Sequence, residues 1–416
     1  MNYPKSQKDF VRFDMTKKPY RQQWYLRPIT WILSFPDVLK HKAKVTKIDM
    51  EGVKPPYLLL GNHNAFLDFK VCTWAIFPHR ANYIVAIDGF IKRELLMRLA
   101  GCICKRKFTN DILMVRHLKR VIENGDVLVV YPEARYSLCG TNAIIPDSVG
   151  KLVKLLNVPV VTLITYGHHV NSPFWNLQER GNHTEATLKQ LMSKQQVKDL
   201  TIEQINELID QDFQYDDFAW QRDNKVAITF ENRAKGLHKV LYQCPNCLTE
   251  YKMDSDKDQI WCNHCKKHWQ MNEYGQLQAL EGETKFSHIP DWYEWERANV
   301  RAEVENKTYF FQSPVHVDSL PNAKGYIPLG KGVLTHDHHG FKLVGKYHDE
   351  PYEMIKPVDS QYACHIEYDY LGKYGDCVDL NTLDDTYYIY PEATYFSVTK
   401  ISLATEELYK HYIKKN

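Results

Sequence analysis

The stretch Leu58–Asp68 has the sequence LLLGNHNAFLD and joins an apolar run to a histidine and an acid. Three leucines that end at Gly61 are typical of a buried strand running into a turn. His63 follows the turn, and Asp68 lies five residues later. Five residues of a regular helix span about 500°, so the two side chains can meet only if His63 precedes a helix whose first turn contains Asp68. Both would then lie at the carboxyl end of a strand, where open α/β sheets bind their ligands.

Strand-like and helix-like segments alternate through the first half of the chain. Buried strands are indicated by four segments, PYLLLG, NYIVAI, DVLVVYPE and PVVTLITYG. Helical spacing of apolar residues marks two segments between them, GFIKRELLMRLAG and NDILMVRHLKRVIENG. This alternation predicts an α/β fold with a largely parallel sheet flanked by helices. A polar helical region is expected to follow over residues 184–212.

The histidine has two interpretations. A neutral imidazole at His63 could take a proton from a hydroxyl group, while Asp68 fixes its tautomer and stabilises the imidazolium that forms. Alternatively, His63 satisfies the backbone of a turn, and Asp68 merely complements the helix dipole. The sequence that follows favours the first interpretation. A basic cluster stands at Lys105–Lys107, and a further apolar run ends in YPEARYS at Tyr131–Ser137.

In this order the motifs resemble those of the glycerolipid acyltransferase family, of the lysophosphatidic acid acyltransferase type. The first motif of the family, NHxxxxD, is matched completely by Asn62, His63 and Asp68. The second is similar to GCICKRK at Gly101–Lys107, which ends in lysine where arginine is usual. The fourth, an apolar strand with prolines, is similar to VPVV at residues 158–161.

The third motif departs most from the family pattern, F-P-E-G-T-R-S. Ala134 replaces the glycine, Arg135 lies one position early, and Tyr136 occupies the usual place of the arginine. Either a neighbouring arginine reaches the acceptor phosphate differently, or the acceptor is not lysophosphatidate.

The resemblance implies an activity for the chain. His63 would be the general base and Asp68 its partner, and a fatty acyl group would pass from acyl-CoA or acyl carrier protein to a hydroxyl of a lysophospholipid. Polar side chains would hold the acceptor head group: Asn62, Lys105, Arg106, Lys107, Glu133 and Arg135. For the basic cluster the alternative is a solvated surface, and for Glu133 with Arg135 it is a structural ion pair. Two other functions stay open, an acyltransferase for amino- or sugar-lipid acceptors and a non-catalytic lipid-binding scaffold.

Four cysteines form a second motif. Cys244 and Cys247 make one CxxC pair, and Cys262 and Cys265 make another after fourteen intervening residues. Two such pairs predict a zinc ribbon in which four thiolates close a tetrahedral site, so the zinc would be structural. A pair of redox dithiols is the alternative. The net charge of +2 gives no field that would attract nucleic acid, and we expect no such partner.

Composition divides the chain into four parts. Residues 1–50 hold eleven Lys or Arg against four Asp or Glu, and we expect a basic membrane-surface segment there. Residues 51–240 would form the acyltransferase domain and residues 241–275 the zinc ribbon. Residues 290–416 would form a β-rich domain that ends in a helix, for which a pleckstrin-homology type is one candidate.

The N-terminal part also bears on location. Trp24–Leu39 mixes aromatic and aliphatic residues with flanking charges, which suits either an interfacial segment or a helix packed on the core, with Pro28 and Pro36 breaking it into short pieces. No apolar run reaches the roughly 18 residues of a membrane-spanning helix, and no secretion signal is evident. The expectation is a cytoplasmic protein, peripheral on the inner face of the membrane.

Overall fold

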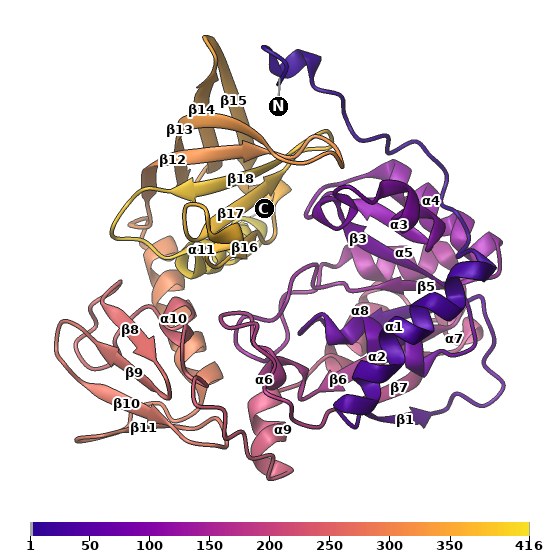
Figure 1. The fold of residues 1–416 in the computed structure, drawn as a ribbon, viewed down its shortest axis with the longest axis horizontal. Helices are drawn as coiled ribbons and strands as arrows, with labels where there is room; N and C mark the ends of the chain where they lie inside the picture. Colours follow the sequence, from indigo (N-terminus) through magenta and orange to yellow (C-terminus); the bar gives the residue numbers. More distant parts are fainter. Residues whose placement is uncertain (1–2, 416) are drawn as a thin grey trace.

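The computed structural model describes residues 3–415, which form three sheets with helices around them (Figure 1). The strands of the first sheet are β1 Lys44–Ile48, β2 Leu58–Gly61, β3 Ala81–Ala86, β4 Cys102–Lys105, β5 Val127–Val130, β6 Val160–Tyr166 and β7 Glu185–Met192. Their order is β1-β7-β6-β2-β5-β3-β4, and every neighbouring pair is parallel except β6 with β7. The predicted fold class, a largely parallel sheet flanked by helices, is confirmed.

Helices cover both faces of this sheet. On one face α1 (Arg27–Lys40) and α2 (Leu67–Ala75) pack over a cluster that includes Leu59. Leu58 and Leu60 face the other side, because side chains alternate along a strand, and there they meet α4 (Ile112–Glu123), α5 (Ser148–Leu156) and α8 (Ile202–Asp212). The remaining short helices are α3 Glu94–Leu99, α6 His168–Asn171, α7 Lys194–Asp199 and α9 Asp217–Asp223.

The structure differs from the sequence prediction at the sheet edge. Residues 185–192 form strand β7 rather than part of a helical region, because pairing with β1 and β6 buries Ala186 and Leu188 on the α1–α2 face of the sheet and, beyond a register shift, Met192 on the other face. The helical prediction is correct only for α7 and α8 beyond it. Strand β1 also belongs to this sheet, although it precedes residue 51, where we placed the start of the domain.

The N-terminal segment contains one helix where short pieces were expected. α1 runs unbroken through Pro36, and Pro28 is tolerated because the first turn of a helix has no backbone partner for its N–H groups. The residues before α1 lie against the C-terminal sheet (Figure 1). The ring of Phe10 packs on that of Tyr347, with centroids 5.4 Å apart, and the N–H of Phe13 donates to the carbonyl of Pro321.

Two antiparallel sheets make up the rest. The cysteine-rich segment holds β8 Met253–Asp256, β9 Gln259–Cys262, β10 His268–Met271 and β11 Leu277–Ala279, and α10 (Ile289–Glu305) follows it. The last sheet has the order β15-β14-β13-β12-β18-β17-β16. Its strands are β12 Phe311–Ser319, β13 Ile327–Asp337, β14 Gly340–Tyr347, β15 Glu350–Pro357, β16 His365–Glu367, β17 Cys377–Asn381 and β18 Thr386–Pro391, and α11 Val398–Lys415 ends the chain. α10 and α11 pack together beside the α/β domain (Figure 1).

Candidate active site

The loop after β2 is fixed to the neighbouring strand by Asn62. Its side-chain amide donates to the carbonyl of Thr165 at 2.9 Å, and its oxygen accepts the N–H of Thr165 at 2.8 Å. Asn62 is fully buried, at the carboxyl ends of the parallel strands β2 and β6. It therefore sets where the next residue, His63, leaves the sheet.

His63 and Asp68 meet as the spacing predicted. His63 lies in the loop, Asp68 lies in the first turn of α2, and Nδ1 of His63 is 3.0 Å from Oδ2 of Asp68. The same oxygen accepts the backbone N–H groups of Asn64 and Ala65 at 2.6 and 3.0 Å. Burial alone would raise the pKa of Asp68, but hydrogen bonds from His168 and His63 hold it well below its ordinary value. The carboxylate is therefore ionised at neutral pH, and Nδ1 of His63 donates to it.

The other ring nitrogen of His63, Nε2, is then left with the lone pair of a base. The ring lies between two tyrosines, stacked on Tyr131 with centroids 4.4 Å apart and tilted against Tyr136 at the same distance. The side chain of His63 keeps 24% of its surface exposed, whereas Asp68 keeps 1%. Solvent or a substrate can therefore reach part of His63, whereas Asp68 is shielded.

The loop after β5 holds the backbone of His63 from both sides. The carboxylate of Glu133 accepts the N–H of His63 at 3.0 Å and that of Ala143 at 2.9 Å, and the N–H of Ser137 donates to the carbonyl of His63 at 2.8 Å. Glu133 is buried, and this burial raises its pKa to about 8. The structure thus gives Glu133 a supporting contact with His63, in place of the open position that head-group binding would require.

A second histidine, which the sequence analysis did not select, contacts the same carboxylate. His168 begins α6 directly after β6, and its Nδ1 is 2.5 Å from Oδ1 of Asp68. The residue is fully buried. The sequence contained one indication of this contact. His168 follows the predicted strand PVVTLITYG, and in a parallel sheet the carboxyl end of that strand lies at the same edge as that of LLLG.

Comparison with known proteins finds a family match in this part of the chain. Residues 40–166 match the family model described as Acyltransferase. The chain contains an acyltransferase domain at these residues. No curated protein matches the sequence. Among solved structures, the 1-acyl-sn-glycerophosphate (LPA) acyltransferase of Thermotoga maritima is 12% identical, over 46% of this chain and 81% of that chain, with a TM-score of 0.34.

The two arginines of this acyltransferase domain that we expected to bind the acceptor head group contact the C-terminal part of the chain instead of an open site. The guanidinium of Arg135 donates to Ser402 and Glu406 of α11. That of Arg106 donates to the carbonyls of Leu320, Pro321 and Asp384 and to the hydroxyl of Thr386. Both arginines are buried. In this structure they hold the domains together and do not face His63.

The two expected head-group lysines are placed differently. The ammonium of Lys105 donates to the carbonyl of Thr109 at 3.0 Å, and burial lowers its pKa. Lys107 is half-buried, and its charge interacts with that of Glu367 in β16. A head-group role for Lys107 stays a prediction, since its ammonium has no hydrogen bond to another described residue.

The four predicted cysteine ligands come together at one point beside β9. The sulfur of Cys244 lies 3.7 Å from that of Cys265, and that of Cys247 lies 3.7 Å from that of Cys262. All four sulfurs lie within 4.8 Å of one another. A tetrahedral zinc ion with Zn–S bonds of about 2.3 Å would separate its sulfurs by about 3.8 Å, so the cluster has the size of a four-thiolate metal site.

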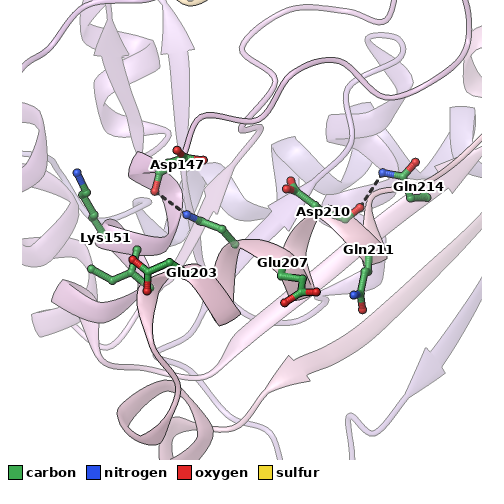
Figure 2. Close-up of a pocket in the computed structure, with 9 residues that line it drawn as sticks. Asp147, Lys151, Glu203, Glu207, Asp210, Gln211 and Gln214 are labelled. Carbon is green, nitrogen blue, oxygen red and sulfur yellow. Dashed lines mark hydrogen bonds between the residues drawn. The ribbon is translucent and has the colours of Figure 1, made fainter. Parts of the chain in front are cut away.

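One surface groove is lined by none of these histidines. Figure 2 shows this groove of about 720 Å³ along α5 and α8, with carboxylates from Asp147, Glu203, Glu207 and Asp210 and one cation, Lys151. None of its lining residues is a hydrogen-bond partner of His63 or Asp68. Its excess of negative charge is unsuited to the phosphates of coenzyme A or a phospholipid.

Proposed function

We propose that the protein is an O-acyltransferase that moves a fatty acyl group from acyl-CoA or acyl carrier protein to a hydroxyl of a lysophospholipid of the 1-acylglycerol-3-phosphate type. The contact of His63 Nδ1 with an ionised, buried Asp68 carries this proposal. Nε2 of His63 takes the proton of the acceptor hydroxyl, whose oxygen bonds to the thioester carbonyl carbon. The C–S bond then breaks, and the leaving thiolate receives the proton from His63. No covalent enzyme intermediate is required.

A second acceptor class is favoured by the arginine contacts. Because Arg106 and Arg135 already have partners within the chain, neither guanidinium is free to grip a phosphate with two hydrogen bonds. An amino- or sugar-lipid with a free hydroxyl would not need such a grip.

The test is a screen of acceptors. The protein would be incubated with labelled acyl-CoA or acyl carrier protein and with lysophosphatidate, an amino-lipid or a sugar-lipid, and the products identified by mass spectrometry. An acylated lysophosphatidate supports the first acceptor class, and products from the other lipids alone support the second. Binding of acyl-CoA and lipid without any product would overturn the enzymatic proposal and leave a lipid-binding scaffold.

We also propose that the protein is cytoplasmic and peripheral on the inner face of the membrane. No helix among residues 3–415 is long and apolar enough to cross a bilayer. Support for surface binding comes from α1, which packs on α2 and exposes Ile32 and Leu33 at 70% and 67%. A cleft of about 390 Å³ at the C-terminal end of α1 is lined by Lys40, Lys42, Lys44, Gly181, His183 and Glu185. Apolar residues beside lysines suit an anionic lipid surface.

Two acidic substitutions on α1 should therefore weaken membrane binding. In the double variant Ile32→Glu/Leu33→Glu, the charges would oppose insertion and the apolar contact would be lost, so we expect about tenfold less protein on anionic vesicles. Cosedimentation with phosphatidylglycerol vesicles measures this. Ile355→Glu is the matched control, since Ile355 is 54% exposed on β15 of the C-terminal sheet. A loss with the control and none with the α1 variant would place membrane docking on the C-terminal domain.

A structural zinc in the cysteine cluster is part of the proposal. Zinc removal by a strong chelator should unfold the ribbon, because a segment of this size has little core of its own. Trp269 of β10 is buried against Trp292 of α10, with ring centroids 5.1 Å apart, so its fluorescence should shift to the red. Elemental analysis should find about one zinc per chain in the wild type and less zinc in Cys244→Ser. The zinc content of Cys102→Ser should equal that of the wild type, since Cys102 lies outside the cluster. Full zinc content in Cys244→Ser would contradict this metal site.

For residues 290–416 we propose a pleckstrin-homology-like domain. A run of four antiparallel strands, a second run of three and a closing helix support this assignment.

A further inference from the structure

We infer that His168 is a positioning residue for the proposed acyl transfer, which holds the Asp68 carboxylate so that its other oxygen faces His63. The inference rests on the proposed role of His63 as the base. Its basis is a carboxylate shared by two imidazoles that come from different strands of the sheet.

The two oxygens of Asp68 have separate partners. Oδ2 receives Nδ1–H of His63 and the N–H groups of Asn64 and Ala65. Oδ1 accepts a hydrogen bond from Nδ1 of His168 at 2.5 Å, and among the described residues its one other donor is the hydroxyl of Thr165, at 3.4 Å. Without His168, Oδ1 would be a buried charged oxygen with one weak donor. Such an oxygen is costly to leave unpaired, and the carboxylate would turn to share its remaining donors.

The turn that carries His168 is itself fixed. Gly167 has a φ of +80°, and a Cβ there would lie 2.7 Å from the ring of Trp220. The buried carboxylate of Asp217, at the start of α9, accepts the N–H of Gly167 at 3.0 Å and that of His169 at 2.7 Å. The backbone on both sides of His168 is thus held from α9, which fixes the position from which its imidazole contacts Asp68.

The charge of the site lies on Asp68, which both imidazoles contact. Asp68 supplies one negative charge, which the imidazolium of His63 needs when it has taken the acceptor's proton. His168 can donate Nδ1–H to the carboxylate without a charge of its own. The titratable groups that face this centre are His63, Asp217, His169, Glu133, Tyr131, Tyr136, Tyr215 and Cys72.

Three substitutions separate positioning from packing. His168→Phe keeps the ring shape but removes the donor, and kcat should fall about tenfold to a hundredfold while KM for the acyl donor changes less than about twofold. His168→Asn puts an amide nitrogen close to the place of Nδ1 and should keep kcat within about threefold. His168→Gln puts its amide near Nε2 instead and should lose activity as the phenylalanine variant does.

The pH dependence of kcat/KM gives a readout that packing alone would not move. Loss of the donor concentrates negative charge on Asp68, which favours the imidazolium of His63, so the acid limb in His168→Phe should move up by about half a pH unit. The control is His169→Phe, a buried neighbour whose ring packs on Trp175 and Phe218 and whose side chain has no hydrogen bond to Asp68 among the described residues. Its acid limb should stay in place.

The inference is overturned if Asn, Gln and Phe at position 168 lose equal activity, or if the acid limb moves no further than in His169→Phe. Should the phenylalanine variant fail to fold, the Asn and Gln pair decides alone, since both are polar and differ only in where the amide lies. A wild-type protein that acylates no acceptor would instead count against the proposed function. The two failures are therefore distinct.

Discussion

Replacement of His63 with alanine should lower kcat by about a thousandfold or more, because the acceptor hydroxyl would then have no base to take its proton. The fold should survive, since the side chain is partly exposed and, within residues 3–415, its hydrogen bond goes to Asp68 alone. Turnover would be measured with labelled acyl-CoA and the acceptor found in the screen, alongside melting temperature and zinc content. His339→Ala removes an exposed histidine from the β13–β14 turn and should leave all three values unchanged.

Asp68→Asn tests the same contact from the other side. An asparagine has the shape of the aspartate, but its amide can donate to Nδ1 of His63 and would then turn the Nε2 proton outward, so the histidine loses its function as a base. We expect a loss of about a thousandfold to ten-thousandfold. Normal turnover in either variant, with the protein folded, would remove this pair from the mechanism.

The part of the site that local sequence determines could be predicted. His63 and Asp68 are five residues apart, and an apolar run, a glycine and a first helical turn suffice to bring them together. The cysteine spacing likewise predicted a cluster of four thiols, since each CxxC pair is a local turn. The central strands were visible as apolar runs because both of their faces are buried.

The features that were missed depend on contacts distant in sequence. β7 has alternate burial of Ala186 and Leu188, but its many polar residues resembled a helix until β1 and β6 paired with it. His168 reaches Asp68 across 100 positions. Arg135 reaches Glu406 across 271 positions, and nothing near an arginine in the sequence reveals whether its partner will be a substrate or the chain itself.

Removal of the Glu406 carboxylate should strongly destabilise the contact between α11 and the acyltransferase domain. Glu406 accepts hydrogen bonds from Arg135 and from Arg297 of α10, and its side chain is fully buried. Glu406→Gln would leave two buried guanidinium groups without their shared charge, which typically costs about 3–5 kcal/mol. Hydrogen exchange in α10 and α11 should then speed up by about a hundredfold or more, as long as these amides exchange by local opening and not by global unfolding.

Glu294→Gln is the matched control, because Glu294 binds the same Arg297 but its side chain is 53% exposed. Its loss should cost less than about 0.5–1 kcal/mol. The double variant Arg135→Met/Glu406→Gln should recover part of the loss, since one of the two unpaired charges is gone. Equal exchange in Glu406→Gln and Glu294→Gln would show that the buried network does not hold the domains together.

Acid should open the same contact. Burial alone would raise the pKa of Glu406, but the charges of Arg135 and Arg297 outweigh it and hold this pKa below the ordinary value of 4.5. A carboxyl with a depressed pKa in the folded state contributes its full stability above the unfolded value, and the contribution is lost as the pH falls through the folded value. Exchange in α11 should therefore accelerate below about pH 4.5 in the wild type. Glu406→Gln should lack the part of this acceleration that comes from position 406, because no proton is left there to bind.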